Sequence, residues 1–398
     1  MNCSSSPSVT RVGELQQQIA LLANLGSVNG SVVSCYLDLR QERSELQSSI
    51  RNQLSRQIAR VAPKHRGAYQ SCIAAIEDQL ESEMPQRARG LAVFTVADGK
   101  APILSAMPFA VPFRSSYTVS RSPDLLPLVQ LKELYGRFMV VLADPAGLQL
   151  AEVNLGDVSI KAWAGRSTNS VSRHAAETGL IERTGTAGLS SQVSLIESRL
   201  CKGGGACPVF LAGDVDVMQA IPDLMGPTLV PRLMGALPMP AGASLYESAA
   251  ECLRALMDFK ANQARTTAAQ VLRGVRNQGH AVAGTPAVLT AMRNGLADRL
   301  VISCDYRPEP GWIRDFMPEN LTPMTPVGPR RDYSANSDSA LEQRLELIRL
   351  AVQLRFPVEF ADTEALHYRG GVGCLLLDPP QTLVQPVPAR YGSLDLVA

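Results

Sequence analysis

The chain has 398 residues, of which 45% are hydrophobic and 19% charged. This length exceeds what one hydrophobic core usually serves, so we expect two or three domains. No apolar run approaches the roughly 18 residues of a membrane span, and the first ten residues lack the pattern of a secretory signal. A cytoplasmic protein without a membrane partner is therefore expected.

The formal net charge is +1, and the balance is similar along the chain. Residues 1–125 carry 13 basic and 10 acidic groups, and residues 251–398 carry 16 of each. Proteins that bind nucleic acid by bulk electrostatics have a pervasive positive field, which this chain lacks. No DNA partner is expected, and any RNA contact would be local and directed by shape.

Eight cysteines are scattered through the sequence, mostly within apolar runs. A chain of this length does not need disulfides for stability, so we expect reduced core thiols. Cys201 and Cys207 flank three glycines, but the four histidines show no spacing of metal ligands. We expect neither a metal site nor another cofactor.

A first domain is predicted over residues 1–125. Apolar runs at 32–39 and 90–96 predict two strands, and two helices are expected between them, over 42–62 and 67–82. The helices are joined by a short basic turn, which would form the tip of a helical hairpin. Such turns are usually only solvated connections, but this one offers three candidate contact residues, Lys64, His65 and Arg66.

A second domain is predicted over residues 130–240. It opens with a hairpin, 137–143 and 148–153, around the turn Asp-Pro-Ala-Gly. Residues 164–192 are rich in Ser, Thr and Gly and cannot bury enough apolar surface to order themselves, so we expect a mobile loop. A helix and a short strand follow, predicted over 193–200 and 209–213.

The third predicted domain spans residues 245–398 and begins with a long helix over 248–277. In the next segment Thr285 and Pro286 predict a helix start, and Gly295 predicts its end before a β-rich run. A proline-rich inserted loop, a helix and two strands complete the domain, predicted over 305–338, 339–354, 358–360 and 370–377. The predicted fold class is α/β (α+β), with three domains of mixed sheets and helices.

Several motifs in these blocks resemble the archaeal and eukaryotic class-one release factors and their relative Pelota. They are SCYLDLR (34–40), RGLAVF (89–94), YGRFMVVLADPAGLQLAEV (135–153), AVAGTPAVLTAMRNGLADRLVIS (281–303) and RGGVGCLLL (369–377). The closest resemblance is to the bacterial group of release-factor-like proteins that includes the ribosome hibernation factor Balon. It implies a last domain similar to the ribosomal proteins that bind kink-turn RNA.

The functional tips of that family are replaced here. Release factors carry Gly-Gly-Gln at the end of the second-domain loop, where glycines permit unusual backbone conformations during peptidyl-tRNA hydrolysis. The resemblance places Ser190, Ser191 and Gln192 at that point, and the stop-codon motif Asn-Ile-Lys-Ser is also absent. We therefore expect no hydrolysis and no codon recognition, and so no enzyme.

The resemblance implies a non-catalytic factor that binds the vacant A site of the 70S ribosome and contacts rRNA. The role that it favours is ribosome hibernation. Elongation factor Tu is the GTPase partner that it implies. The candidate contacts are Lys64, His65 and Arg66, together with Ser190, Ser191 and Gln192.

Other interpretations stay open at this point: ribosome rescue, and an RNA- or protein-binding module outside translation. A hydrolase, including a peptidyl-tRNA hydrolase, is a further alternative, since the second-domain loop holds the residue types of a nucleophile and its base, Ser190, Ser191, His174, Glu177 and Glu182.

Overall fold

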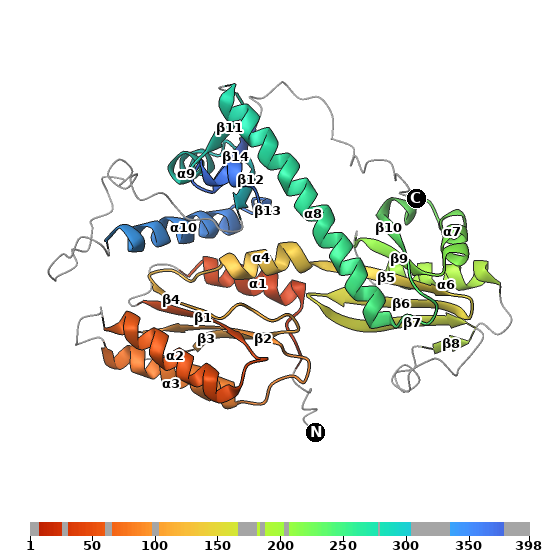
Figure 1. Cartoon of the computed structure of the whole chain (residues 1–398), viewed down its shortest axis with the longest axis horizontal. Coiled ribbons are helices and arrows are strands. Elements are labelled where there is room, and N and C mark those ends of the chain that lie inside the picture. Colours follow the sequence, from red (N-terminus) through yellow and green to blue (C-terminus); the bar gives the residue numbers. More distant parts are fainter. Residues whose placement is uncertain are drawn as a thin grey trace. The chain divides into compact units, whose positions relative to one another are not determined.

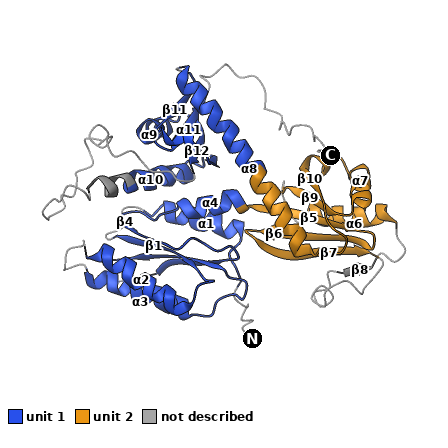
Figure 2. Cartoon of the chain, in the orientation of Figure 1, with its two compact units in different colours: residues 1–134, 259–383 blue, residues 135–258, 384–398 orange. Residues whose placement is uncertain are grey.

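A computed structural model provides the structure of the chain (Figure 1). The residues that it describes are 8–25, 31–59, 66–97, 103–165, 181–183, 188–202, 207–277, 279–303 and 335–377. They fall into two compact units (Figure 2). One unit contains Met1–Leu134 and Phe259–Leu383, and the other contains Tyr135–Asp258 and Val384–Ala398. The three-domain boundaries stay a prediction, although each of the three sheets falls within one predicted domain.

The first sheet is antiparallel, with the strand order β3-β2-β1-β4. Its elements are α1 (Val12–Ala23), β1 (Val32–Asp38), α2 (Arg43–Ile58), α3 (Arg66–Glu81), β2 (Gly90–Val96), β3 (Ile103–Phe109), β4 (Ser116–Ser120) and α4 (Leu126–Tyr135). Helices α2 and α3 cover one face of the sheet (Figure 1), where their apolar sides meet Val33, Cys35, Leu37 and Val93. The two predicted strands and the helical hairpin are confirmed.

The second sheet has six strands in the order β10-β9-β5-β6-β7-β8. Its unit contains β5 (Arg137–Asp144), β6 (Gly147–Asn154), β7 (Asp157–Gly165), β8 (Ile181–Arg183), α6 (Leu189–Lys202), β9 (Val209–Gly213), α7 (Val215–Leu224), the 3-10 turn η2 (Val230–Arg232) and β10 (Leu233–Pro238). Strands β5, β6 and β7 form an antiparallel meander, and β9 joins β5 in parallel. Apolar residues of α6 and α7 pack on one face of this sheet.

Helix α8 (Leu245–Arg276) runs through both units. Its first half packs Ala249, Cys252 and Leu256 against the second face of the six-stranded sheet. Its second half packs Ala264 and Ala268 against the third sheet. The predicted helix over 248–277 is confirmed, but it serves two cores rather than the third domain alone.

The third sheet has the order β11-β14-β12-β13. It is built from β11 (Ala281–Ala283), α9 (Thr285–Arg293), β12 (Ala297–Ser303), α10 (Ala335–Gln353), β13 (Val358–Ala361), α11 (Glu364–His367) and β14 (Val372–Leu376). Strand β14 lies between β11 and β12 and is antiparallel to both. The predicted helix and the β-rich run after it are confirmed as α9 and β12, and the predicted closing strand lies between β11 and β12.

The start of α9 differs in detail from the prediction. Gly284, with φ +88°, has a non-helical backbone and is the N-cap residue. Thr285 is therefore the first helical residue. Pro286 lies in the first turn as predicted. At the other end Gly295 has φ +67°, and the next amide, that of Leu296, donates to Ala291 O at 2.9 Å. This is the glycine-ended helix terminus that the sequence predicts.

A buried acid connects sequence-distant parts of the first unit. The Asp124 side chain lies just after β4, and its Oδ2 accepts a hydrogen bond from Arg344 Nη2 of α10 at 2.9 Å. The amide nitrogen of Asp124 donates to Ser34 Oγ of β1 at 3.0 Å, and its carbonyl accepts from the Tyr36 hydroxyl. The carboxylate of Asp124 thus joins α10 to a residue more than 200 positions away, and the backbone of Asp124 binds β1.

Six cysteines lie in the described part of the chain, and all six are free thiols. Cys201 is exposed and the other five are buried, as predicted for core thiols. Cys3 and Cys304 lie outside the described residues. Among the described helices, none is long and apolar enough to cross a membrane.

Candidate functional site

Of the first candidate contact group, the structure describes only Arg66, at the junction of α2 and α3. Arg66 is the first residue of α3; it is exposed, and its Nη2 donates to the carbonyl of Ala59 at the end of α2, 3.2 Å away. Lys64 and His65 lie outside the described residues. Arg51 and Glu77 form an ion pair of 2.6 Å between the two helices, which fixes their pairing beneath this junction. The structure therefore places Arg66 at one end of a braced helical hairpin.

The second candidate group lies in α6 rather than in a loop. The predicted loop over 164–192 is wrong in part, because β7 extends to Gly165, β8 spans Ile181–Arg183 and α6 begins at Leu189. The amides of Ser191 and Gln192 both donate to the carbonyl of Gly188, at 3.0 and 3.4 Å. All three candidate residues are in the first turn of this helix, whose apolar side is anchored in the core below it.

The helix gives the three residues different environments. Ser190 and Ser191 are exposed, whereas Gln192 is only 7% exposed and precedes the buried Val193. The two serines thus remain candidate contacts with their side chains in solvent. Gln192 is placed on the core side of the helix, a position that the sequence alone did not predict.

The residues of the hydrolase alternative are not brought together by the described structure. His174 and Glu177 lie outside the described residues, and nothing is described of the side chain of Glu182 in β8. No base is therefore placed against Ser190 or Ser191 within the described part of the chain. The prediction that the chain is not an enzyme stays a prediction.

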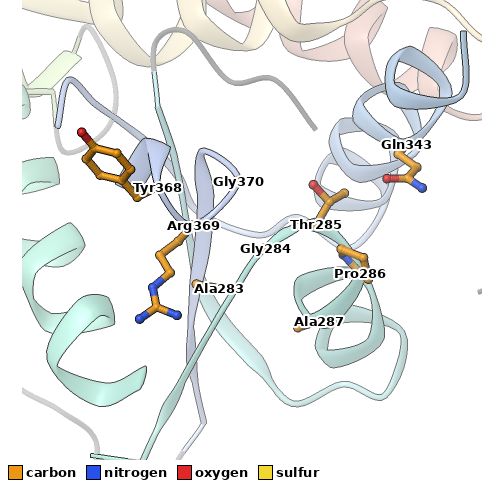
Figure 3. Close-up of a pocket in the computed structure, with 9 residues that line it drawn as sticks. All are labelled: Ala283, Gly284, Thr285, Pro286, Ala287, Gln343, Tyr368, Arg369 and Gly370. Atoms are coloured by element: carbon orange, nitrogen blue, oxygen red, sulfur yellow. The ribbon is translucent and has the colours of Figure 1, made fainter. Parts of the chain in front are cut away.

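A cavity of about 210 Å³ opens at the start of α9 in the third sheet region. Figure 3 shows Thr285 and Pro286 on one side of it, Tyr368 and Arg369 on the segment before β14, and Gln343 on α10. The Tyr368 side chain is 83% exposed, and Arg369 is exposed too. An arginine, a tyrosine and an amide around a helix start are suited to hydrogen bonding and stacking with a polar ligand.

The two sides of this cavity are held together by backbone contacts. The amide of Gly284 donates to the carbonyl of Val372 at 2.9 Å. The Gly-Thr-Pro motif at the start of α9 (284–286) and the Gly-Gly-Val-Gly motif at the start of β14 (370–373) therefore meet directly. Gly370 and Gly371 have φ values of +79° and +69°, a conformation that favours glycine. The sequence singled out both motifs, but it gave no signal for Gln343, which comes from a separate helix.

A charged cluster lies at the end of the second sheet. The Glu152 side chain of β6 is buried, and its oxygens accept from Arg137 Nε at 2.6 Å and pair with Lys161 Nζ at 2.7 Å. Burial alone would raise the pKa of Glu152, but the hydrogen bonds and charges of Lys161 and Arg137, with Asn154, lower it to about 2. The carboxylate thus stays ionised and holds three strands together.

Known proteins that are similar to the chain are found among solved structures. No protein-family model and no curated protein matches it. Among solved structures it is similar to the archaeal translation termination factor aRF1, with 14% identity, a TM-score of 0.27 and coverage of 92% of this chain and 98% of that chain.

Two further structures are similar. Dom34 of S. cerevisiae, a translation termination-like factor involved in RNA quality control, has 12% identity and a TM-score of 0.40, with 73% of this chain and 80% of that chain covered. An archaeal Pelota, from a model of ribosome-bound Pelota and ABCE1, has 13% identity and a TM-score of 0.36, with 92% and 94% covered.

Proposed function

We propose that this chain is a ribosome-binding translation factor that does not hydrolyse peptidyl-tRNA. It would bind the vacant A site of the 70S ribosome, contact rRNA and act in hibernation, in the cytoplasm, with elongation factor Tu as its GTPase partner. The release-factor resemblance of the sequence motifs is the basis of this proposal.

One observation carries the proposal: two motifs of that resemblance contact each other in the structure, through Gly284 and Val372, which are 88 positions apart. The amide of Gly284, in the Gly-Thr-Pro motif, donates to the carbonyl of Val372 in the Gly-Gly-Val-Gly motif. Glycines of both motifs have positive φ values, a conformation that favours glycine. Motifs that resembled the family only by chance would not be expected to contact each other in the fold. The contact supports the view that the motifs derive from one architecture.

The environment of Ser190, Ser191 and Gln192 supports the non-catalytic part of the proposal. A catalytic glutamine tip needs a backbone free to approach the substrate, which glycines permit. Here two serines with helical backbone and a buried glutamine occupy that position. Hydrolysis would require α6 to lose its first turn and Gln192 to leave the core.

The test is co-sedimentation of the purified full chain with 70S ribosomes from growing and from stationary cells, over a series of salt concentrations. We expect salt-sensitive binding that is strongest to idle ribosomes and is reduced by deacylated tRNA in the A site. Binding to actively translating ribosomes alone would favour rescue over hibernation. No binding in either state would refute the proposal.

A second candidate function is an RNA- or protein-binding module outside translation, favoured by the cavity beside α9. Its rim carries the exposed Tyr368 and Arg369 next to the Thr285 end of the helix. The variant pair Tyr368→Ala and Arg369→Gln separates the two functions. If they abolish capture of a cellular RNA or protein while ribosomes never bind, the second candidate replaces the first.

A further inference from the structure

We infer that the exposed face of the second half of α8 binds the sugar-phosphate backbone of RNA. This basic face of α8 comprises Asn262, Arg265, Thr266, Ala269, Gln270, Arg273, Arg276 and Asn277, all of them exposed. The inference deepens the proposed function, since it names a surface through which the chain would contact rRNA. It is nevertheless tested separately from ribosome binding.

The second half of α8 and the segment after it carry only positive charges, although basic and acidic groups are equal in number over residues 251–398. Residues 259–297 contain one lysine and four arginines but no aspartate or glutamate, as the sequence shows. Lys260 is half-buried and donates to the carbonyl of Glu133, and Arg293 pairs with Glu346 at 3.4 Å. Three arginines are left to face solvent on α8: Arg265, Arg273 and Arg276.

The geometry of the helix gathers these three arginines on one side. At 3.6 residues per turn they lie within about 80° of one another around the axis. The opposite side is buried: Ala264, Thr267, Ala268 and Val271 are each at most 3% exposed. The buried and exposed sides of this helix are thus clearly separated. Packing of the buried side fixes the rotation of the helix, which keeps the three arginines toward solvent.

No acidic partner neutralises the three arginines within the described residues. Arg265 Nη1 donates only to Asn262 Oδ1, at 2.8 Å, a neutral partner one turn away. Beside this face, Glu359 is bound by Arg299 at 3.1 Å and by Gln263 at 3.3 Å. Asp258, the nearest acid on the helix before the segment, lies about 10 Å along the axis from Arg265.

The spacing and composition of the face favour RNA over an acidic protein. Along the axis Arg265 and Arg273 are about 12 Å apart, and Arg276 lies about 5 Å further, so long side chains can reach several phosphates of one strand. Guanidinium groups bind phosphate oxygens bidentately, and amide and hydroxyl side chains serve sugar oxygens. Protein interfaces have an apolar core, which these eight exposed residues lack.

The first experiment measures binding of the full chain to a fluorescein-labelled 20-base-pair RNA duplex, by anisotropy over a salt series. The triple variant R265Q/R273Q/R276Q should bind at least about tenfold more weakly, with a salt slope lower by about 2. The triple Arg→Lys variant keeps the charge and should retain most of the affinity and the slope. Arg254→Gln is the matched control, because Arg254 is exposed on the same helix but paired with Glu251 at 2.5 Å.

The outcomes separate this inference from the proposed function. An unchanged affinity and slope of the triple glutamine variant, or no binding of the duplex by the parent chain, overturns the inference. If the parent chain binds the duplex through these arginines but does not sediment with ribosomes, the inference stands and the proposed function falls. If it sediments and the triple variant sediments equally over the same salt series, only the inference falls.

A second experiment distinguishes RNA from protein as the occupant. Benzoylphenylalanine replaces Ala269, which lies between the arginines and is exposed, in the full chain bound to ribosomes. Crosslinks to rRNA support the inference, and crosslinks confined to ribosomal proteins overturn it. The same group at Arg254 should give no rRNA crosslink.

Discussion

At the scale of single residues, we expect the buried carboxylate of Glu152 to contribute to the pH dependence of stability. The pKa of Glu152 is lowered from 4.5 to about 2 in the folded chain, mainly through Lys161 and Arg137 acting against the effect of burial. A carboxyl group whose pKa is lower in the folded state stabilises that state at any pH above its unfolded pKa. This contribution is lost as the pH falls from the unfolded pKa toward the folded one.

We expect Glu152 to contribute about 2–3 kcal/mol to the free energy of unfolding at pH 7, and to lose that contribution between about pH 4.5 and pH 2. Glu152→Gln should lower the stability at pH 7 and flatten the acid limb. Urea denaturation at a series of pH values measures both effects. An acid limb of unchanged steepness in the variant would show that other carboxylates dominate.

Glycine positions offer a second residue-scale prediction. A Cβ on Gly373 would lie 2.5 Å from Cγ1 of Val271, a fully buried side chain that cannot rotate away. Gly373→Ala should therefore destabilise the third sheet by about 1–3 kcal/mol. Gly67→Ala is the matched control, since nothing lies within 4 Å of its Cβ in α3, and it should stabilise by about 0.5 kcal/mol.

Thermal unfolding of the two glycine variants checks this prediction. The melting temperature should fall for Gly373→Ala and rise slightly for Gly67→Ala. Equal shifts in the same direction would mean that the close packing of β14 on α8 does not hold in solution.

At the scale of elements, the sequence predicted those with strong apolar runs and clear end signals. Strands β1, β2 and β9 and helix α8 were predicted within a few residues, because their burial is nearly continuous or strongly periodic. Strand β3 was missed, because it contains Pro108, which cannot donate a hydrogen bond to a neighbouring strand. It is tolerated there because β3 lies at the edge of the sheet.

Two further missed elements have weak local signals. Helix α7 carries Pro222 and strand β10 contains Pro238, and a proline inside an element weakens its local signal. Tertiary packing on the six-stranded sheet, rather than local preference, stabilises them. Of the candidate site, the sequence located the glycine motifs but not Gln343, nor the helical state of Ser190, because those depend on how separate segments pack.

Helix α6 supplies the element-scale prediction. Restoring the release-factor motif with S190G/S191G puts two glycines into its first turn, which should lower the free energy of unfolding by about 1 kcal/mol. Because Gln192 remains buried, the variant should gain no peptidyl-tRNA hydrolysis over the parent chain. Chemical denaturation and release of labelled peptide from ribosomes are the two measurements, and a gain in release would show that the glycines alone suffice.

At the scale of the whole molecule, sequence order and compact units differ. Met1–Leu134 and Phe259–Leu383 share one unit, while the chain between them forms the core of the other. Within the first unit the ion pair of Asp124 and Arg344 is accompanied by a hydrogen bond from Gln353 Nε2 to the carbonyl of Ala23, at 2.9 Å. No local sequence pattern predicts such contacts, since each partner alone is an ordinary polar residue.

A double-mutant cycle tests whether these distant segments are coupled in solution. The Asp124 and Arg344 side chains are only 8% and 25% exposed, so removing one partner leaves the other poorly solvated. Asp124→Ala and Arg344→Ala should each destabilise, and the double variant should cost less than their sum by about 1–2 kcal/mol. Additive effects would mean that the two segments are not held together by this pair.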